Sequence, residues 1–112
     1  PLEEFKELLT PDDDAFRKLN FKLAQVGPIQ MQLGQPPEGD TYQGRFLEER
    51  GEGVFHMGFV VDDVDAAEAE AVSRGLEVLM RGRRDNGSGF TYFKAAEKGG
   101  ITLSIRKSPP VS

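Results

Sequence analysis

The second half of the chain changes from a strand pattern to a helical pattern after residue 61, and this change limits its fold more than any other feature. Residues 54–61 (VFHMGFVV) are almost entirely apolar, which is typical of a strand buried in a sheet. Asp62 and Asp63 follow, and either side chain can cap a helix whose acidic first turn suits the helix dipole. The residues up to Arg74 then place apolar side chains at helical spacing, and a glycine comes next. A strand followed directly by a helix is therefore expected over residues 54–74.

Three short strands are expected after this helix. They are predicted at residues 76–80 (LEVLM), 90–95 (FTYFKA) and 101–105 (ITLSI). Between the first two, an Asn-Gly pair gives a strong hairpin signal. The basic run RGRRDNG, residues 81–87, is expected to be a solvated hairpin, or else to meet an acidic group of a substrate such as a phosphate or carboxylate. The second half therefore has the order strand, helix, strand, strand, strand.

The first half contains what looks like the tail of the same unit. Its predicted elements are a strand, with a helix as the alternative, at residues 3–9, a loop at 10–14, a hairpin of strands at 16–26 and 29–35 that turns at Gly27 and Pro28, and a connecting helix at 44–50. The expected fold class is α+β, in a single domain. A complete βαβββ module is expected at residues 53–112, joined by a connecting helix at 44–52 to the remainder of another at 1–43, which lacks its opening strand and helix.

Charge and composition argue against several classes of partner. The net charge of −5 argues against nucleic acid, because a phosphate-binding surface needs clustered Lys and Arg. No apolar run approaches the ~20 residues of a membrane span, so no membrane partner is expected. The chain has no cysteine, which excludes disulfides and thiolate nucleophiles and fits a cytoplasmic protein.

Strand periodicity gathers several polar side chains on one surface. Gln30 and Gln32 alternate with apolar residues in one strand, and Thr102 and Ser104 do so in another. His56, the single histidine, stands opposite the most apolar face of its own strand. These five side chains are expected on a common surface, which is either solvent-facing or a ligand cleft. The plain alternatives are that a lone strand histidine is a hydrogen-bonded structural residue and that the glutamines face solvent.

Three runs of the sequence resemble the vicinal oxygen chelate superfamily, in particular its glyoxalase and methylmalonyl-CoA epimerase branch. They are LAQVGPIQMQLGQP, FLEERGEGVFHMGFVVDDVDAAEAEAVSRGLEVL and GFTYFKAAEKGGITLSI, in that order, and the resemblance covers residues 16–106. It implies paired βαβββ modules whose sheets curl around a cleft. It also implies one divalent metal ion in that cleft, Mg, Mn, Co, Ni or Fe, acting as a Lewis acid on a bound oxygen pair.

The resemblance also implies which residues form the site. His56 matches the first-strand metal ligand of the second module, and Gln32 matches the last-strand ligand of the first. Ser104 stands at the fourth ligand position, where the family usually has glutamate. The candidate substrate-binding residues are Gln30, Thr102 and Tyr92.

The sequence departs from the family pattern at three places. The strand and helix that would supply the first module's histidine are not in the sequence. Ser104 is a neutral replacement for a carboxylate. Ala15 and Phe16 occupy the positions that match the carboxylate base of the epimerases, with Asp14 only nearby, so no catalytic residue is assigned. A set of His, Gln and Ser carries no charge to offset a dication, so weak metal binding or none is expected.

Two classes of function stay open on this basis. The first is a metal-dependent isomerase or lyase of the glyoxalase or epimerase type, acting on a small carbonyl or acyl-CoA substrate. The second is a metal-free protein that binds a small, partly apolar molecule in the same cleft, as resistance members of the superfamily do. In both cases a homodimer is expected, because an incomplete module exposes a sheet edge that a second subunit would cover.

Overall fold

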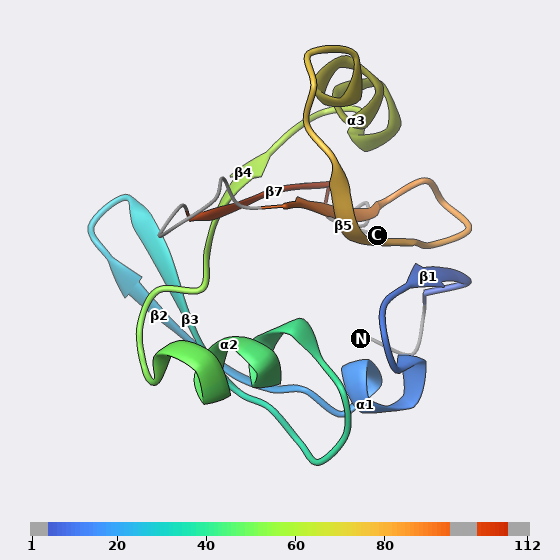
Figure 1. Ribbon diagram of the computed structural model, residues 1–112. Helices are drawn as coiled ribbons and strands as arrows, with labels where there is room; N and C mark the ends of the chain where they lie inside the picture. The colour runs from blue at the N-terminus through green and yellow to red at the C-terminus, as the bar shows by residue number, and fades with distance from the viewer. Residues whose placement is uncertain (1–4, 95–100, 108–112) are drawn as a thin grey trace. The chain divides into compact units, whose positions relative to one another are not determined.

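The computed structural model of the protein describes residues 5–94 and 101–107 (Figure 1). The chain divides into two compact units, which are described separately. The described residues of the sheet unit are 5–10, 54–94 and 101–107, and the hairpin unit comprises Pro11–Gly53. Among the described residues, no helix has both the length and the apolar character needed to cross a membrane.

The sheet unit is built on five strands in the order β1-β5-β6-β7-β4. Their bounds are Glu7–Leu9 for β1, His56–Val60 for β4, Val78–Arg83 for β5, Gly89–Phe93 for β6 and Thr102–Lys107 for β7. β4 runs parallel to β7, and the other neighbours are antiparallel. Helix α3 (Val64–Ser73) packs on one face, over β6 and β7 (Figure 1). This confirms the α+β class and the predicted βαβββ order of the second half.

Helix α3 begins and ends where the sequence indicates. The Asp63 carboxylate accepts a hydrogen bond of 3.0 Å from the Ala66 N–H, which makes it the N-cap. At the other end, Gly75 has φ +98°, a left-handed conformation that favours glycine, and its N–H donates to the Val72 carbonyl. Local residues therefore set both ends of α3.

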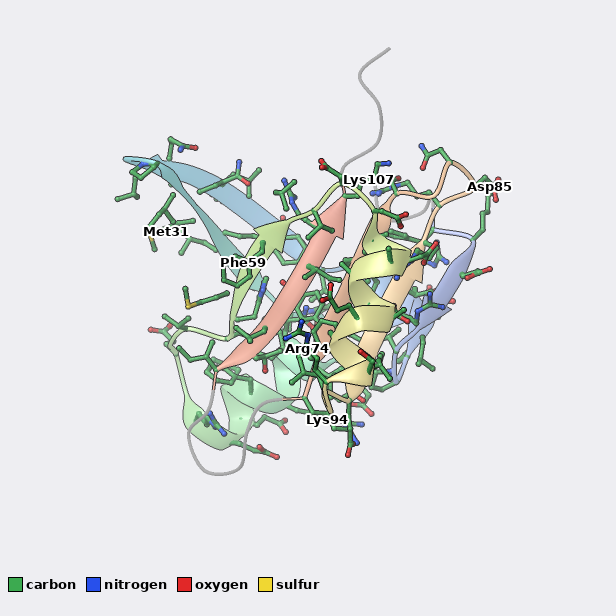
Figure 2. The ribbon with its side chains drawn as sticks, turned by 90° about the horizontal axis from the view of Figure 1, so that it is seen from above. Met31, Phe59, Arg74, Asp85, Lys94 and Lys107 are labelled. Atoms are coloured by element: carbon green, nitrogen blue, oxygen red, sulfur yellow. The ribbon has the colours of Figure 1, made fainter. Side chains whose placement is uncertain are left out.

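The hairpin unit contains two short helices and one two-stranded sheet. Its elements are α1 (Asp13–Arg17), β2 (Asn20–Val26), β3 (Ile29–Gln35) and α2 (Tyr42–Arg50). β2 and β3 pair antiparallel around Gly27, which has φ +59°. This confirms the predicted hairpin and connecting helix. The apolar side chains of β3 are exposed, including Met31 at 47% (Figure 2).

Several predicted boundaries were wrong, for local reasons. The expected loop at residues 10–14 already contains the start of α1, because the Asp12 carboxylate accepts from the Ala15 N–H as a cap. β2 consequently begins at Asn20, later than predicted. β5 continues to Arg83 and does not end at Met80. The predicted strand at residues 90–95 ends at Phe93, and its last residue lies outside the described part of the chain.

The basic run at residues 81–87 forms the predicted hairpin, but only its tip, residues 85–87, is fully exposed. Arg83 is 5% exposed, and its guanidinium donates to the Glu68 carboxylate of α3 over 2.6 Å. Arg81 donates to the same carboxylate oxygen over 3.0 Å, and the buried Thr91 hydroxyl is a third donor to it. Both arginines therefore join α3 to the sheet, which accounts for β5 extending beyond its expected end.

Candidate functional site

The face of the sheet opposite α3 carries the chain's single histidine. His56 and Gly58 of β4 stand beside Thr102 and Ser104 of β7 in the parallel register, and Tyr92 of β6 pairs with Ser104 on the other side. Side chains two residues apart in a strand share a face, so all five positions lie on the same side of the sheet. Three strands thus bring a histidine, two small hydroxyl residues and a tyrosine together.

Both ring nitrogens of His56 are hydrogen-bonded. Nδ1 lies 3.0 Å from the Ser104 hydroxyl oxygen, and Nε2 lies 3.1 Å from the Tyr92 hydroxyl oxygen. The His56 and Tyr92 rings are tilted against each other, with centroids 4.6 Å apart. We call these three side chains the His56 row. In this row Ser104 and Tyr92 are both direct partners of the His56 ring.

The His56 row is electrically neutral at physiological pH. Burial lowers the pKa of His56 below its ordinary value of 6.5, which favours the uncharged imidazole. Burial also raises the pKa of Tyr92 above its ordinary value of 10.0, so its hydroxyl stays protonated. Ser104 is 4% exposed. An uncharged ring between two uncharged hydroxyls is the form in which each group finds a hydrogen-bond partner.

Gly58 places no side chain beside this row. A Cβ atom at position 58 would lie 2.9 Å from the Ser104 hydroxyl oxygen and 3.8 Å from Cε1 of His56. A larger residue would therefore crowd the Ser104 hydroxyl, whereas glycine leaves it uncovered from this position of β4.

Aromatic rings border the row. Phe55 stacks on Tyr92 with centroids 6.1 Å apart, and Phe90 meets Tyr92 edge-on at 5.5 Å. Phe5 continues the series, edge-on to Phe90 at 5.1 Å. A neutral polar centre beside aromatic side chains is the composition of many small-molecule sites.

The donors gathered here fit a resident divalent cation poorly. Among the described residues, no group of three or more His, Cys, Asp or Glu side chains is close enough to hold a metal. The row offers one imidazole and two hydroxyls, without a carboxylate, and both imidazole nitrogens already have hydroxyl partners. Hard dications prefer several oxygen ligands with negative charge among them.

The remaining predicted site residues divide between the units. Thr102 is 7% exposed and pairs with His56 in the strand register. Gln30 and Gln32 belong to β3 of the hairpin unit, on the face that carries Leu23 and Gln25 of β2. Their predicted convergence with His56 therefore stays a prediction. Gly58 and the Tyr92–His56 bond were missed, since the strand register that creates both cannot be read from alternation alone.

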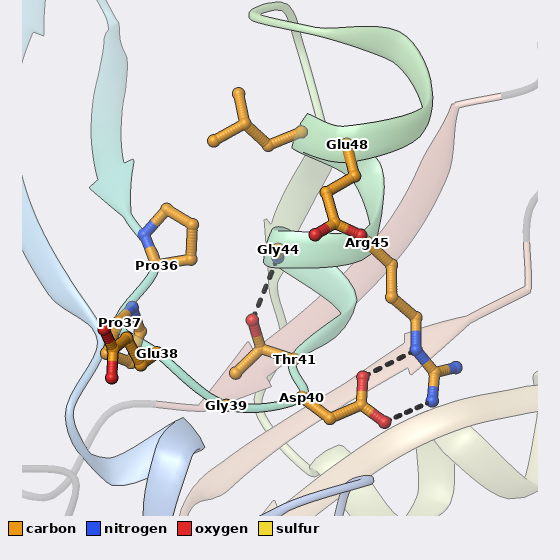
Figure 3. Close-up of a pocket in the computed structure, with 10 residues that line it drawn as sticks. Pro36, Pro37, Glu38, Gly39, Asp40, Thr41, Gly44, Arg45 and Glu48 are labelled. Carbon is orange, nitrogen blue, oxygen red and sulfur yellow. Dashed lines mark hydrogen bonds and ion pairs between the residues drawn. The ribbon is translucent and has the colours of Figure 1, made fainter.

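The hairpin unit has a pocket of its own at the start of α2. It measures about 320 Å³ and lies between the β3–α2 connection and the first turns of the helix (Figure 3). Thr41 caps the helix by accepting from the Gly44 N–H at 2.9 Å, and Arg45 forms a two-fold ion pair with Asp40. Thr41, Asp40 and Arg45 thus have hydrogen-bond partners within the pocket wall. We therefore assign these residues to the capping and stabilisation of α2 and not to catalysis.

The fold is similar to several solved structures. A hypothetical protein from Bacillus halodurans C-125 has a TM-score of 0.72 at 16% identity, with 95% of this chain and 78% of that chain covered. Methylmalonyl-CoA epimerase from Mycobacterium tuberculosis has a TM-score of 0.68 at 22% identity, covering 92% and 73%. A variant of the Streptomyces coelicolor methylmalonyl-CoA epimerase, in complex with 2-nitronate-propionyl-CoA, has a TM-score of 0.71 at 23% identity, covering 96% and 78%.

At these identities the structural likeness establishes the fold, and the family follows from the sequence. A search of curated proteins found no match to the chain. The family model described as the Glyoxalase/Bleomycin resistance protein/Dioxygenase superfamily matches residues 7–93. That match spans β1 to β6, including the strand that carries His56, and the chain belongs to this superfamily.

Proposed function

We propose that this chain binds a small organic molecule against the His56 face of the sheet, without a resident divalent metal. The observation that carries the proposal is the pair of hydroxyl partners on His56, at 3.0 Å and 3.1 Å. A ring whose two nitrogens are bonded to neutral groups is satisfied without a cation. Such a row can hold a ligand through hydrogen bonds while the neighbouring aromatic rings contact its apolar part.

The first ligand class to test is the acyl-CoA thioester. Two of the similar folds are methylmalonyl-CoA epimerases, and one of these is in complex with 2-nitronate-propionyl-CoA. A short acyl thioester combines one carbonyl oxygen with a small apolar chain, which suits a neutral hydroxyl next to aromatic side chains. The fold likeness alone does not fix the ligand, and the chemistry of the row supports it independently.

The second candidate is a metal-dependent isomerase or lyase acting on a small carbonyl or acyl-CoA substrate. It is favoured by the neutral state of His56, the form in which imidazole binds metals, and by Gln32 on the polar face of β3. In that case His56, Gln32 and Ser104 would be the ligands. This set has no carboxylate, so it fits a dication less well than the metal-free proposal.

We also propose that the protein forms a homodimer. The apolar face of the β2–β3 hairpin supports it, because Val26, Ile29, Met31 and Leu33 are 47–64% exposed on one side of a two-stranded sheet. An isolated hairpin is marginally stable, and a second subunit is one means of covering such a face. Light scattering on the purified protein would give the mass, and a monomer at micromolar concentration would contradict this part.

Metal content and ligand binding, measured on one preparation, separate the two candidates. After treatment with EDTA, propionyl-CoA should raise the melting temperature of the wild type and of Ser73→Ala, whose hydroxyl lies on α3. The rise should be lost in His56→Ala, with circular dichroism confirming that this variant folds. If purified protein retains about one equivalent of metal that His56→Ala loses, the second candidate replaces the first. An unchanged melting temperature with propionyl-CoA would reject the acyl-thioester assignment.

A further inference from the structure

The His56 row has one more polar hydrogen than its own bonds require. If the ring hydrogen is on Nε2, Ser104 donates to Nδ1, Nε2 donates to the Tyr92 oxygen, and the Tyr92 hydrogen remains. If the ring hydrogen is on Nδ1, it is donated to Ser104, Tyr92 donates to Nε2, and the Ser104 hydrogen remains. The tautomer of His56 thus decides which end of the row has a hydrogen to offer.

We propose that the row is a reversible hydrogen-bond relay, in which the His56 tautomer decides whether Ser104 donates to, or accepts from, an oxygen of the bound ligand. The inference rests on the proposed function, since it needs the ligand to lie against this face. It deepens that function by assigning the contact to Ser104 and by making Tyr92 a positioning residue. Tyr92 acts through the ring, because its bond to Nε2 favours one tautomer.

Gly58 decides from which side a ligand oxygen can reach Ser104. A Cβ atom at position 58 would lie 2.9 Å from the Ser104 oxygen and 3.8 Å from Cε1 of His56, so any side chain there would crowd the hydroxyl and contact the ring. Because position 58 is glycine, no side chain from this position of β4 covers the Ser104 hydroxyl. The ligand oxygen would therefore approach over Gly58, at contact distance from its Cα atom.

The relay defines a class of ligand. With the ring hydrogen on Nδ1, Ser104 donates, and the matching ligand group is a carbonyl oxygen. With the ring hydrogen on Nε2, Ser104 is free to accept, and the matching group is an alcohol or enol hydroxyl. One site can therefore hold the carbonyl form or the hydroxyl form of the same compound without a change of charge. An anion or a dication would place a charge beside the row, and the row has no opposite charge to compensate it.

Neutrality keeps the relay intact near physiological pH. A protonated imidazolium would donate from both nitrogens, and neither hydroxyl could then donate to the ring. The lowered pKa of His56 and the raised pKa of Tyr92, both caused by burial, keep the ring and the phenol uncharged. The Ser104 and Tyr92 hydroxyls have no other hydrogen-bond partner among the described residues, so each is free to reverse direction.

The relay is tested first on the free protein by nitrogen-15 NMR. His56 is the single histidine, so its two ring resonances need no assignment among others. In Ser104→Ala, Tyr92 should donate to Nε2 and move the tautomer towards Nδ1–H. In Tyr92→Phe, Ser104 should donate to Nδ1 and move it towards Nε2–H. Ser73→Ala should leave both resonances unchanged. Shifts in the same direction, or no shifts, would overturn the relay.

The ligand contact is tested with two matched probes. Propionyl-CoA has the thioester carbonyl, and S-propyl-CoA has a methylene in its place. Wild-type protein should bind propionyl-CoA about three- to tenfold more tightly, as expected for one hydrogen bond, and Ser104→Ala should lose this preference. Equal binding of both probes to the wild type, or an unchanged preference in Ser104→Ala, overturns the relay alone. Binding of neither probe overturns the acyl-thioester function together with the ligand contact.

Discussion

The ion pairs between α3 and the sheet allow a quantitative test of how this fold is held together. One oxygen of the Glu68 carboxylate accepts from Arg83 over 2.6 Å, from Arg81 over 3.0 Å and from the Thr91 hydroxyl. The Glu68 side chain is 18% exposed and that of Arg83 is 6% exposed. Removal of Glu68 leaves a buried guanidinium without its main partner and a buried hydroxyl without its acceptor.

The expected cost of Glu68→Ala follows from this burial. Removing one partner of a buried pair costs about 3–5 kcal/mol, whereas an exposed pair contributes about 0–1 kcal/mol. Arg83 retains the Asp65 carboxylate at 2.8 Å, but Asp65 is 67% exposed and is a weaker partner. Arg83 also retains a bond to the Phe90 carbonyl. We therefore expect Glu68→Ala to lower the free energy of unfolding by about 2–3 kcal/mol.

Urea denaturation measures this difference directly. Glu70→Ala is the matched control, because it makes the same change on the same helix and breaks an exposed pair with Arg74 whose side chains are 76% and 66% exposed. Both variants gain the same helix propensity, so that contribution cancels. The control should change the free energy of unfolding by less than about 0.5 kcal/mol. The reasoning is refuted if the two variants have the same transition midpoint at an unchanged m-value.

Four further predictions concern the same unit. Burial raises the pKa of Glu68, but the hydrogen bonds from Thr91 and the ion pairs with the arginines outweigh burial and hold the pKa below 4.5. The stabilisation that the Glu68 carboxylate gives should therefore be complete above pH 4.5 and be lost as the pH falls through the folded-state pKa. Urea titrations of the wild type and of Glu68→Ala should then give converging free energies of unfolding in acid. Gly89→Ala should cost more than about 3 kcal/mol, since its Cβ would lie 2.1 Å from the Gly82 carbonyl oxygen. Gly87→Ala, with a left-handed backbone in open space, should cost only about 1–2 kcal/mol by thermal melting. Asp63→Ala should cost about 1 kcal/mol through loss of the α3 cap, and a smaller change in melting would indicate that the cap is not needed.

Much of the sheet unit could be predicted because its elements are marked by local signals. The apolar run before Asp63, the cap itself and the glycine after α3 each act within a few residues, so sequence alone places β4 and α3. The same local reasoning would have found α1, since Asp12 caps it and Asp14 pairs with Lys18 four residues later at 2.9 Å. The short length of α1 made the acidic run look like a loop.

The extension of β5 could not be predicted from its own residues. A run of arginines is typical of a solvated turn, and nothing local identifies a partner for it. The partner is Glu68, fifteen residues away on α3, and the two meet only because β5 pairs with β6, which lies under that helix. Long-range ion pairing thus determined a boundary that hydrophobic alternation placed three residues too early.

The candidate site shows the same division between local and long-range information. Alternation predicted that His56 lies opposite the apolar face of its own strand, and the resemblance to a known family predicted that Ser104 belongs to the same site. In the structure the two side chains are in contact. The bond to Tyr92 depends on β6 pairing with β7 in one register, which no local signal specifies. Gly58 likewise gains its meaning only from the Ser104 hydroxyl across the strand.

Ser104, which the resemblance predicts at a metal-ligand position, is also a residue that completes the row. A carboxylate next to Nδ1 of a half-buried imidazole would favour the charged ring or a bound cation, because a buried negative charge needs a positive partner. A hydroxyl at position 104 needs neither, since it can donate to the ring or accept from it. Tyr92 provides the same choice at the other nitrogen. The row therefore has no charge to compensate, and the group that it can bind most readily is another neutral oxygen.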